Sequence, residues 1–160
     1  IEYDERIYEK AAENQKRAAA AGRVTFELAN AEQFQVPEEA DRIYFFNPFS
    51  LEILQKVISR IIASYYAATR EILLFFYYPS DEYISFLMTV DELTFSDEID
   101  CGDLFQGKDP CERIVIFEIC ECAELWRSDR RGERMAHYKT VFRSLETAVQ
   151  AAFAHADVTP

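Results

Sequence analysis

Glycine, cysteine and histidine are all scarce in this sequence of 160 residues, which holds four glycines, four cysteines and two histidines. So few cysteines exclude a disulfide-rich scaffold and fit a reducing compartment. The two histidines, His137 and His155, both lie after residue 120, and no Ser-His-Asp or Cys-His arrangement is supported. The glycines are spread along the chain, and no two lie close enough to form a glycine-rich turn around a ligand.

A long hydrophobic run is missing as well. The longest apolar stretch, from Ile72 to Pro79, is far shorter than a transmembrane helix requires. The charged start of the chain, with Glu2, Asp4 and Glu5, does not have the pattern of a signal peptide. We therefore expect a soluble protein of the cytoplasm, with no membrane partner.

Basic residues are outnumbered, because 17 Lys and Arg stand against 29 Asp and Glu and give a formal net charge of -12 at pH 7. Such a charge argues against broad, non-specific attraction to nucleic acid. The imbalance is confined to residues 1–120, with 11 basic and 23 acidic side chains, since residues 121–160 hold 6 of each. We therefore expect a core over residues 1–120 and a separate tail over residues 121–160.

Three segments of the core have strand patterns. Val24 to Leu28 alternates apolar and polar residues, whereas Ile43 to Phe46 and Ile72 to Tyr78 are continuous apolar runs of the kind found in buried parallel strands. Leu93 to Ile99 and Arg113 to Ile119 are two further strands, and no helix-length segment separates them. This pair is expected to form an antiparallel hairpin.

Helices are expected between these strands. Asp4 is a plausible N-cap for a first helix and Ser50 for a second, and a short helical segment follows over Asp81 to Met88. Apolar residues at three-and-four spacing form the buried stripe of the second helix: Leu54, Val57, Ile58, Ile61, Ile62 and Tyr65. Lys56 and Arg60 are then expected to face water. The order predicts an α/β fold with three αβα layers and a mostly parallel sheet closed by an antiparallel C-terminal hairpin.

Three short segments carry candidate site residues. Glu2 stands at the start of the chain, Asn30 and Ala31 follow the Val24 to Leu28 strand, and Asn47, Pro48 and Phe49 follow the Ile43 to Phe46 strand. In open α/β sheets, ligands bind beyond the carboxyl ends of the strands. Each segment also has an ordinary structural interpretation: a carboxylate in a first helical turn, a tolerant turn residue, and a strand terminator whose ring packs in the core.

Together with the expected C-terminal hairpin, Leu93 to Ile119, these segments resemble the Rossmann-like core of a class I S-adenosylmethionine-dependent methyltransferase. The resemblance implies that the Glu2 carboxylate accepts hydrogen bonds from the cofactor ribose, and that Asn30 with the backbone N–H of Ala31 reads the adenine. It implies that Asn47, Pro48 and Phe49 form the catalytic segment that holds the methyl acceptor, and that the last strand of the sheet is antiparallel.

The sequence departs from the family in three ways. Asn30 stands where the family often has Asp, and a single proline, Pro48, stands where amino-methylating members have two. The glycine-rich motif that follows the family's first strand does not occur in this sequence. We therefore expect a partial methyltransferase core that is competent only together with such a segment.

The tail has a helical pattern of its own. Its apolar residues recur at alternating spacings of three and four: Met135, Tyr138, Phe142, Leu145, Val149 and Ala152. An amphipathic C-terminal helix is expected, packed on the sheet or on a partner. The spacing of Cys101, Cys111, Cys120 and Cys122 is not that of zinc fingers or ribbons, so no metal site is expected.

Two functions are compatible with these patterns. The first is methyl transfer from S-adenosylmethionine to an unidentified nitrogen or oxygen acceptor. The alternative is a non-catalytic α/β interaction domain that associates through an open sheet edge or through the C-terminal helix.

Overall fold

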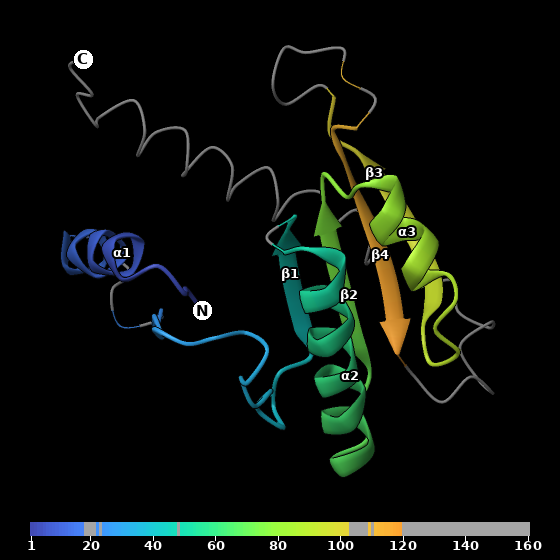
Figure 1. Ribbon diagram of the computed structural model, residues 1–160, viewed down its shortest axis with the longest axis horizontal. Coiled ribbons are helices and arrows are strands. Elements are labelled where there is room, and N and C mark those ends of the chain that lie inside the picture. The colour runs from blue at the N-terminus through green and yellow to red at the C-terminus, as the bar shows by residue number, and fades with distance from the viewer. Residues whose placement is uncertain (18–21, 23, 48, 103–108, 110, 120–160) are drawn as a thin grey trace.

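The computed structural model describes residues 1–17, 22, 24–47, 49–102, 109 and 111–119. Seven elements follow one another along these residues (Figure 1): α1 (Glu5–Arg17), β1 (Arg42–Phe46), α2 (Leu51–Ala67), β2 (Ile72–Tyr77), α3 (Asp81–Leu87), β3 (Thr94–Asp100) and β4 (Arg113–Ile119). The expected C-terminal helix and the rest of the tail, residues 121–160, lie outside the described residues.

The four strands form one mixed sheet in the order β1-β2-β4-β3. β1 pairs with β2 in parallel, and β4 lies antiparallel to both β2 and β3. The α/β class and the antiparallel hairpin of β3 and β4 are confirmed. The expectation of a mostly parallel sheet is wrong for the described residues. Parallel neighbours need a crossover connection, and among the paired strands only β1 and β2 are joined by one, through α2.

The expectation of a strand from Val24 to Leu28 is also wrong. Only Leu28 takes part in a bridge, which is parallel and isolated and joins it to Glu2. Two backbone hydrogen bonds of 2.9 Å make this bridge, from Glu2 N to the Glu27 carbonyl and from Ala29 N to the Glu2 carbonyl. An alternating pattern does not make a strand without a neighbour to pair with, and Val24 and Leu28 remain almost half exposed.

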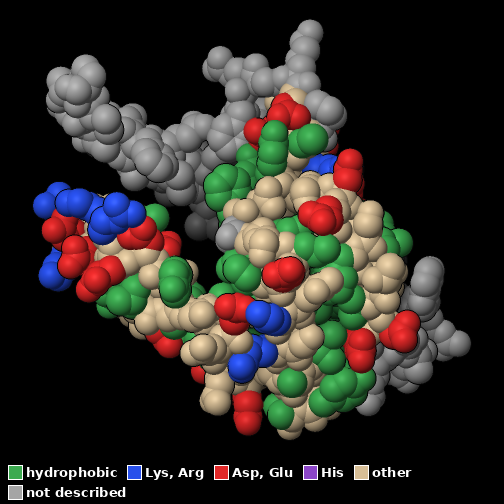
Figure 2. Space-filling model, in the orientation of Figure 1, with side chains coloured by type: hydrophobic (Ala, Val, Ile, Leu, Met, Phe, Trp, Pro, Cys, Tyr) green, Lys and Arg blue, Asp and Glu red, His purple; other side chains and the backbone are tan. Residues whose placement is uncertain are grey.

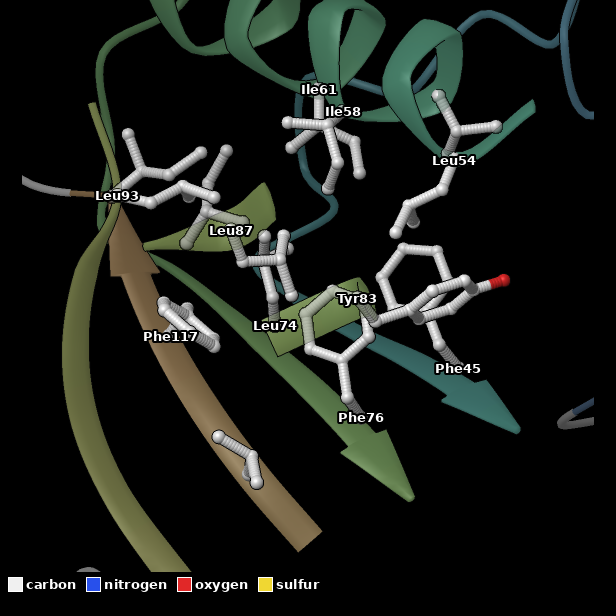
Figure 3. Close-up of a cluster of buried hydrophobic side chains, with 14 of the residues drawn as sticks. Phe45, Leu54, Ile58, Ile61, Leu74, Phe76, Tyr83, Leu87, Leu93 and Phe117 are labelled. Carbon is white, nitrogen blue, oxygen red and sulfur yellow. The ribbon is translucent and has the colours of Figure 1, made fainter. Parts of the chain in front are cut away.

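Both α2 and α3 pack on the same face of the sheet (Figure 3). The predicted stripe of α2 is buried there, except that Ile62 is only partly buried. Leu54, Ile58 and Ile61 point at Phe45, Leu74 and Phe76 of the strands, while Tyr83 and Leu87 of α3 complete the layer. The stacked rings of Phe45 and Phe76, 4.6 Å apart, show how closely β1 and β2 are packed beneath α2.

The second face of the sheet carries its own buried cluster, which includes Leu73, Phe75, Ile114 and Ile116. No described helix contributes to this cluster, so the described residues show two layers rather than the expected three. Helix α1 stands apart from the sheet in Figure 1 and has no buried residue. Its charged side chains give the outlying lobe its blue and red surface in Figure 2.

Candidate functional site

A cavity of about 710 Å³ lies between the N-terminal residues and the sheet. Its walls come from residues 1–3, from the segment 29–41 that leads into β1, from β1 itself and from one side of α2. Figure 2 shows the gap between the outlying lobe and the main body of the molecule. Most lining side chains are apolar, and the polar ones are Glu2, Asn30, Glu32 and Arg60, together with the hydroxyls of Tyr3 and Tyr44. A volume of this size is typical of small-molecule sites.

Glu2 lies at this cavity because its backbone pairs with Leu28. Its carboxylate oxygen Oε1 accepts hydrogen bonds of 2.8 Å from the N–H groups of Tyr3 and Asp4, just ahead of α1. This local role differs from the carboxylate in a first helical turn that was the ordinary structural interpretation, because Glu2 lies three residues before α1 begins. A carboxylate has about four acceptor positions on two oxygens, so the remaining capacity of Glu2 suffices for hydroxyl donors of a ligand.

Asn30 and Ala31 also line the cavity, two and three residues after the bridge at Leu28. The side-chain oxygen of Asn30 accepts a hydrogen bond of 2.9 Å from the N–H of Glu32, which closes an Asx turn. Within the described part of the chain, the N–H of Ala31 donates to no other group. The turn therefore presents a backbone donor beside an amide oxygen that has a second lone pair.

The Asn47 to Phe49 turn follows β1 at the carboxyl end of the parallel pair. Asn47 has a positive φ of 38°, and Tyr78, which follows the neighbouring strand β2, has a φ of 52°. Phe49 lines the cavity and packs edge-on against Phe45 at 6.3 Å, whereas Asn47 does not line it. Pro48 lies outside the described residues. It is uncommon for two non-glycine residues with left-handed backbone conformations to follow neighbouring strands at the same end of a sheet. Backbone strain of this kind often occurs at functional sites.

Charge at the cavity is shared between Glu32 and two cations of α2. Lys56 Nζ lies 2.5 Å from Glu32 Oε1, and Arg60 Nε donates to the Glu32 carbonyl. The hydrogen bond from Lys56, followed by that from Asn30, lowers the pKa of Glu32, and the same ion pair raises the pKa of Lys56. The expectation that Lys56 and Arg60 only face water was therefore incomplete: both side chains are exposed and also hydrogen-bond to this turn.

Aromatic side chains of β1 form another part of the wall. Tyr44 and Phe46 both line the cavity, with 50% and 62% of their surface exposed, and Phe46 stacks on Tyr77 at 5.2 Å. Partial burial, and to a smaller extent Cys101, raise the pKa of Tyr44 to about 12, so its hydroxyl stays protonated at neutral pH. Sequence reasoning missed these residues as site candidates because an apolar run does not show which strand is at an edge.

The described residues hold no group of three or more metal-ligating side chains, and no helix among them is long and apolar enough to cross a membrane. Comparison of the chain with protein-family models, curated proteins and solved structures gave no match. The class of ligand that the cavity could bind is therefore argued from its lining residues alone. A carboxylate, a backbone N–H and several aromatic faces suit a nucleoside, whose hydroxyls, ring nitrogens and flat base need these partners.

Proposed function

We propose that this chain is part of an S-adenosylmethionine-dependent methyltransferase that acts on a nitrogen or oxygen acceptor. One observation carries the proposal: Glu2, Asn30, Ala31 and Phe49, chosen from separate parts of the sequence, all line one cavity. The resemblance assigns the first three to the cofactor and the last to the acceptor. The cavity extends along β1 to the turn that follows it, and in open α/β sheets ligands bind beyond the carboxyl ends of the strands.

The topology of the sheet supports the proposal. The resemblance implies an antiparallel last strand, and β4 is antiparallel to both of its neighbours. The parallel bridge from Glu2 to Leu28 brings the acidic residue within two positions of the adenine-reading turn. Both features follow from pairing between distant segments, which the separate sequence motifs do not themselves specify.

The residues fit a bound adenosyl group as follows. Glu2 would accept from the ribose hydroxyls, and Asn30 with the N–H of Ala31 would meet the edge of the base. The cofactor would supply an activated methyl group on its sulfonium. Asn47, which stands two residues before Phe49 and outside the cavity lining, would orient the acceptor through its amide. Positioning of this kind accounts for much of the rate of such a reaction.

Full activity in this proposal needs a glycine-rich segment, because backbone N–H groups must approach the polar end of the cofactor closely. The decisive experiment is calorimetric titration with S-adenosylmethionine and S-adenosylhomocysteine. It is made on this chain and on the full-length product of the gene that encodes it. Saturable binding to the full-length product, weakened by Glu2→Ala, supports the proposal. Absence of binding to both proteins rejects it.

The alternative function, an interaction domain, is favoured by one observation. β1 is an edge strand of the described sheet, and its Tyr44 and Phe46 are half-exposed or more. The other edge strand, β3, is less suited to pairing, because a bulge between Phe95 and Asp97 and several carboxylates interrupt it. Sedimentation velocity distinguishes the two functions. An interaction domain is identified if the protein forms a dimer, if Phe46→Lys dissociates this dimer, and if calorimetry finds no cofactor binding.

A further inference from the structure

The wall of the cavity formed by residues 29–41, called here the connecting segment, has little regular structure of its own. Eight of its residues line the cavity: Ala29, Asn30, Ala31, Glu32, Phe34, Val36, Pro37 and Ala40. In Figure 1 it runs, in light blue, from below α1 to the start of β1 without a helix or strand. Its internal backbone hydrogen bonds close only short turns at each end. The position of this wall must therefore be fixed by other parts of the chain.

Side chains of α2 hold the connecting segment at three places. Lys56 pairs with the Glu32 carboxylate, Arg60 donates to the Glu32 carbonyl, and Ser64 Oγ donates to the Val36 carbonyl at 3.2 Å. The three residues are spaced by four, so they lie in one row along the helix. This row faces the segment while the apolar stripe of the same helix faces the sheet.

Arg70, three residues beyond the end of α2, completes the attachment. Its Nε donates to the Ala40 carbonyl at 2.9 Å and its Nη2 to the Pro37 carbonyl at 3.2 Å. The other N–H groups donate to the Ser64 and Ala68 carbonyls and to Ser64 Oγ. All five N–H groups of this guanidinium are thus engaged. Arg70 joins the C-terminal end of α2 to the wall without lining the cavity itself.

We propose that Arg70 is a positioning residue for the nucleoside ligand, acting through the Pro37 and Ala40 carbonyls. This inference rests on the proposed function. By holding the connecting segment in its binding form before the ligand arrives, Arg70 keeps the fraction of binding-competent molecules high. Apparent affinity falls in proportion to that fraction, so loosening the wall weakens binding without removing any contact to the ligand.

The test compares Arg70→Gln with Arg113→Gln in the full-length product of the gene. Arg113 is a matched control because it makes an ion pair with Glu98 at 3.4 Å between β4 and β3 and does not line the cavity. S-adenosylhomocysteine is the probe, titrated by calorimetry. Hydrogen exchange of the amides of residues 33–40 is measured without ligand. Arg70→Gln is expected to speed this exchange and to weaken binding about five- to tenfold. A fall of the same factor in the fraction of binding-competent molecules would have this effect. Arg113→Gln should change neither quantity.

Each outcome decides the inference. Unchanged affinity in Arg70→Gln beside faster exchange overturns the positioning role and leaves the proposed function standing. No binding to the unaltered protein rejects both. If Arg70→Gln does not fold, Ser64→Ala provides the second variant, because it removes one bond to Val36 and one to Arg70. If Ser64→Ala exchanges faster but binds with the affinity of the unaltered protein, the inference is overturned. If Ser64→Ala binds more weakly, the inference is supported.

Discussion

The hydroxyl of Tyr83 donates a hydrogen bond to the carbonyl of Phe49 at 2.5 Å and accepts one from the N–H of the same residue at 3.0 Å. Tyr83 belongs to α3 and is 2% exposed. One phenol thus satisfies both backbone groups of the residue that ends the turn after β1. Its burial, only partly offset by the bond to Phe49, raises the pKa of Tyr83 and keeps the hydroxyl protonated as a donor.

Tyr83→Phe should therefore destabilise the protein by about 1 to 3 kcal/mol, since it leaves both backbone groups of Phe49 without this partner. Urea unfolding measures the loss, and hydrogen exchange of the Phe49 amide should become faster. Tyr66→Phe is the matched control, because its exposed hydroxyl makes only a 3.4 Å contact with Glu92. Equal losses in both variants would show that the Tyr83 hydroxyl does not hold the turn.

Asn47 combines a left-handed backbone with a candidate role in acceptor binding. Asn47→Ala should cost about 1 kcal/mol of stability, because alanine adopts a positive φ less readily than asparagine does. Asn47→Gly should restore that stability. Thermal unfolding measures both variants.

The same pair of variants separates the backbone from the amide. In an active full-length protein both should reduce turnover more than about tenfold, a loss of about 1.4 kcal/mol in transition-state stabilisation. Normal turnover in Asn47→Gly would mean that only the backbone conformation matters and that the amide does not serve the acceptor.

Glu2 has a local role in addition to the proposed one, so two substitutions are needed. Glu2→Ala should weaken S-adenosylmethionine binding by about 1 to 3 kcal/mol, the usual effect of removing a charged hydrogen-bond partner. Glu2→Gln keeps an oxygen for the N–H groups of Tyr3 and Asp4 but removes the charge. Calorimetry should find intermediate affinity for Glu2→Gln. Unchanged affinity in both variants would restrict Glu2 to the start of α1.

The Glu32–Lys56 pair predicts a dependence on pH. The pKa of Glu32 is lowered in the folded chain, chiefly by the hydrogen bond from Lys56. Its stabilising contribution is therefore present above the unfolded pKa and is lost as the pH falls through the lowered folded value. Lys56→Met should raise the Glu32 midpoint in an NMR titration. Lys10→Met, which removes the partner of Glu13, should leave Glu32 unchanged and raise the midpoint of Glu13 instead. A Glu32 midpoint unaltered by Lys56→Met contradicts the pairing.

The position of β4 inside the sheet predicts unequal effects of two neighbouring phenylalanines. Phe117 is fully buried, whereas Phe95 of the edge strand is 46% exposed, and their rings meet edge-on at 6.1 Å. Phe117→Ala should cost about 3 to 5 kcal/mol in urea unfolding. Phe95→Ala should cost about 1 kcal/mol, close to the value of the ring contact alone. Similar losses at both positions would place β4 at an edge.

Local patterns were sufficient for several elements of this fold. The spacing of Leu54, Ile58 and Ile61 predicted α2 and its buried face, and the continuous apolar runs predicted β1 and β2. The absence of a helix-length segment between residues 100 and 113 predicted the antiparallel pair. These features depend on side-chain periodicity and on the reach of short connections, both of which are properties of neighbouring residues.

Pairing between distant segments decided the rest. Val24 to Leu28 has a strand pattern but only one bridge, since a strand needs the backbone groups of a neighbour that no local pattern supplies. For the same reason no local pattern indicated the bridge that places Glu2 beside the Asn30 turn, or the bonds of Arg70 to the Pro37 and Ala40 carbonyls. Backbone carbonyls are identical in every residue, so which ones a guanidinium meets depends on where the folded chain brings them.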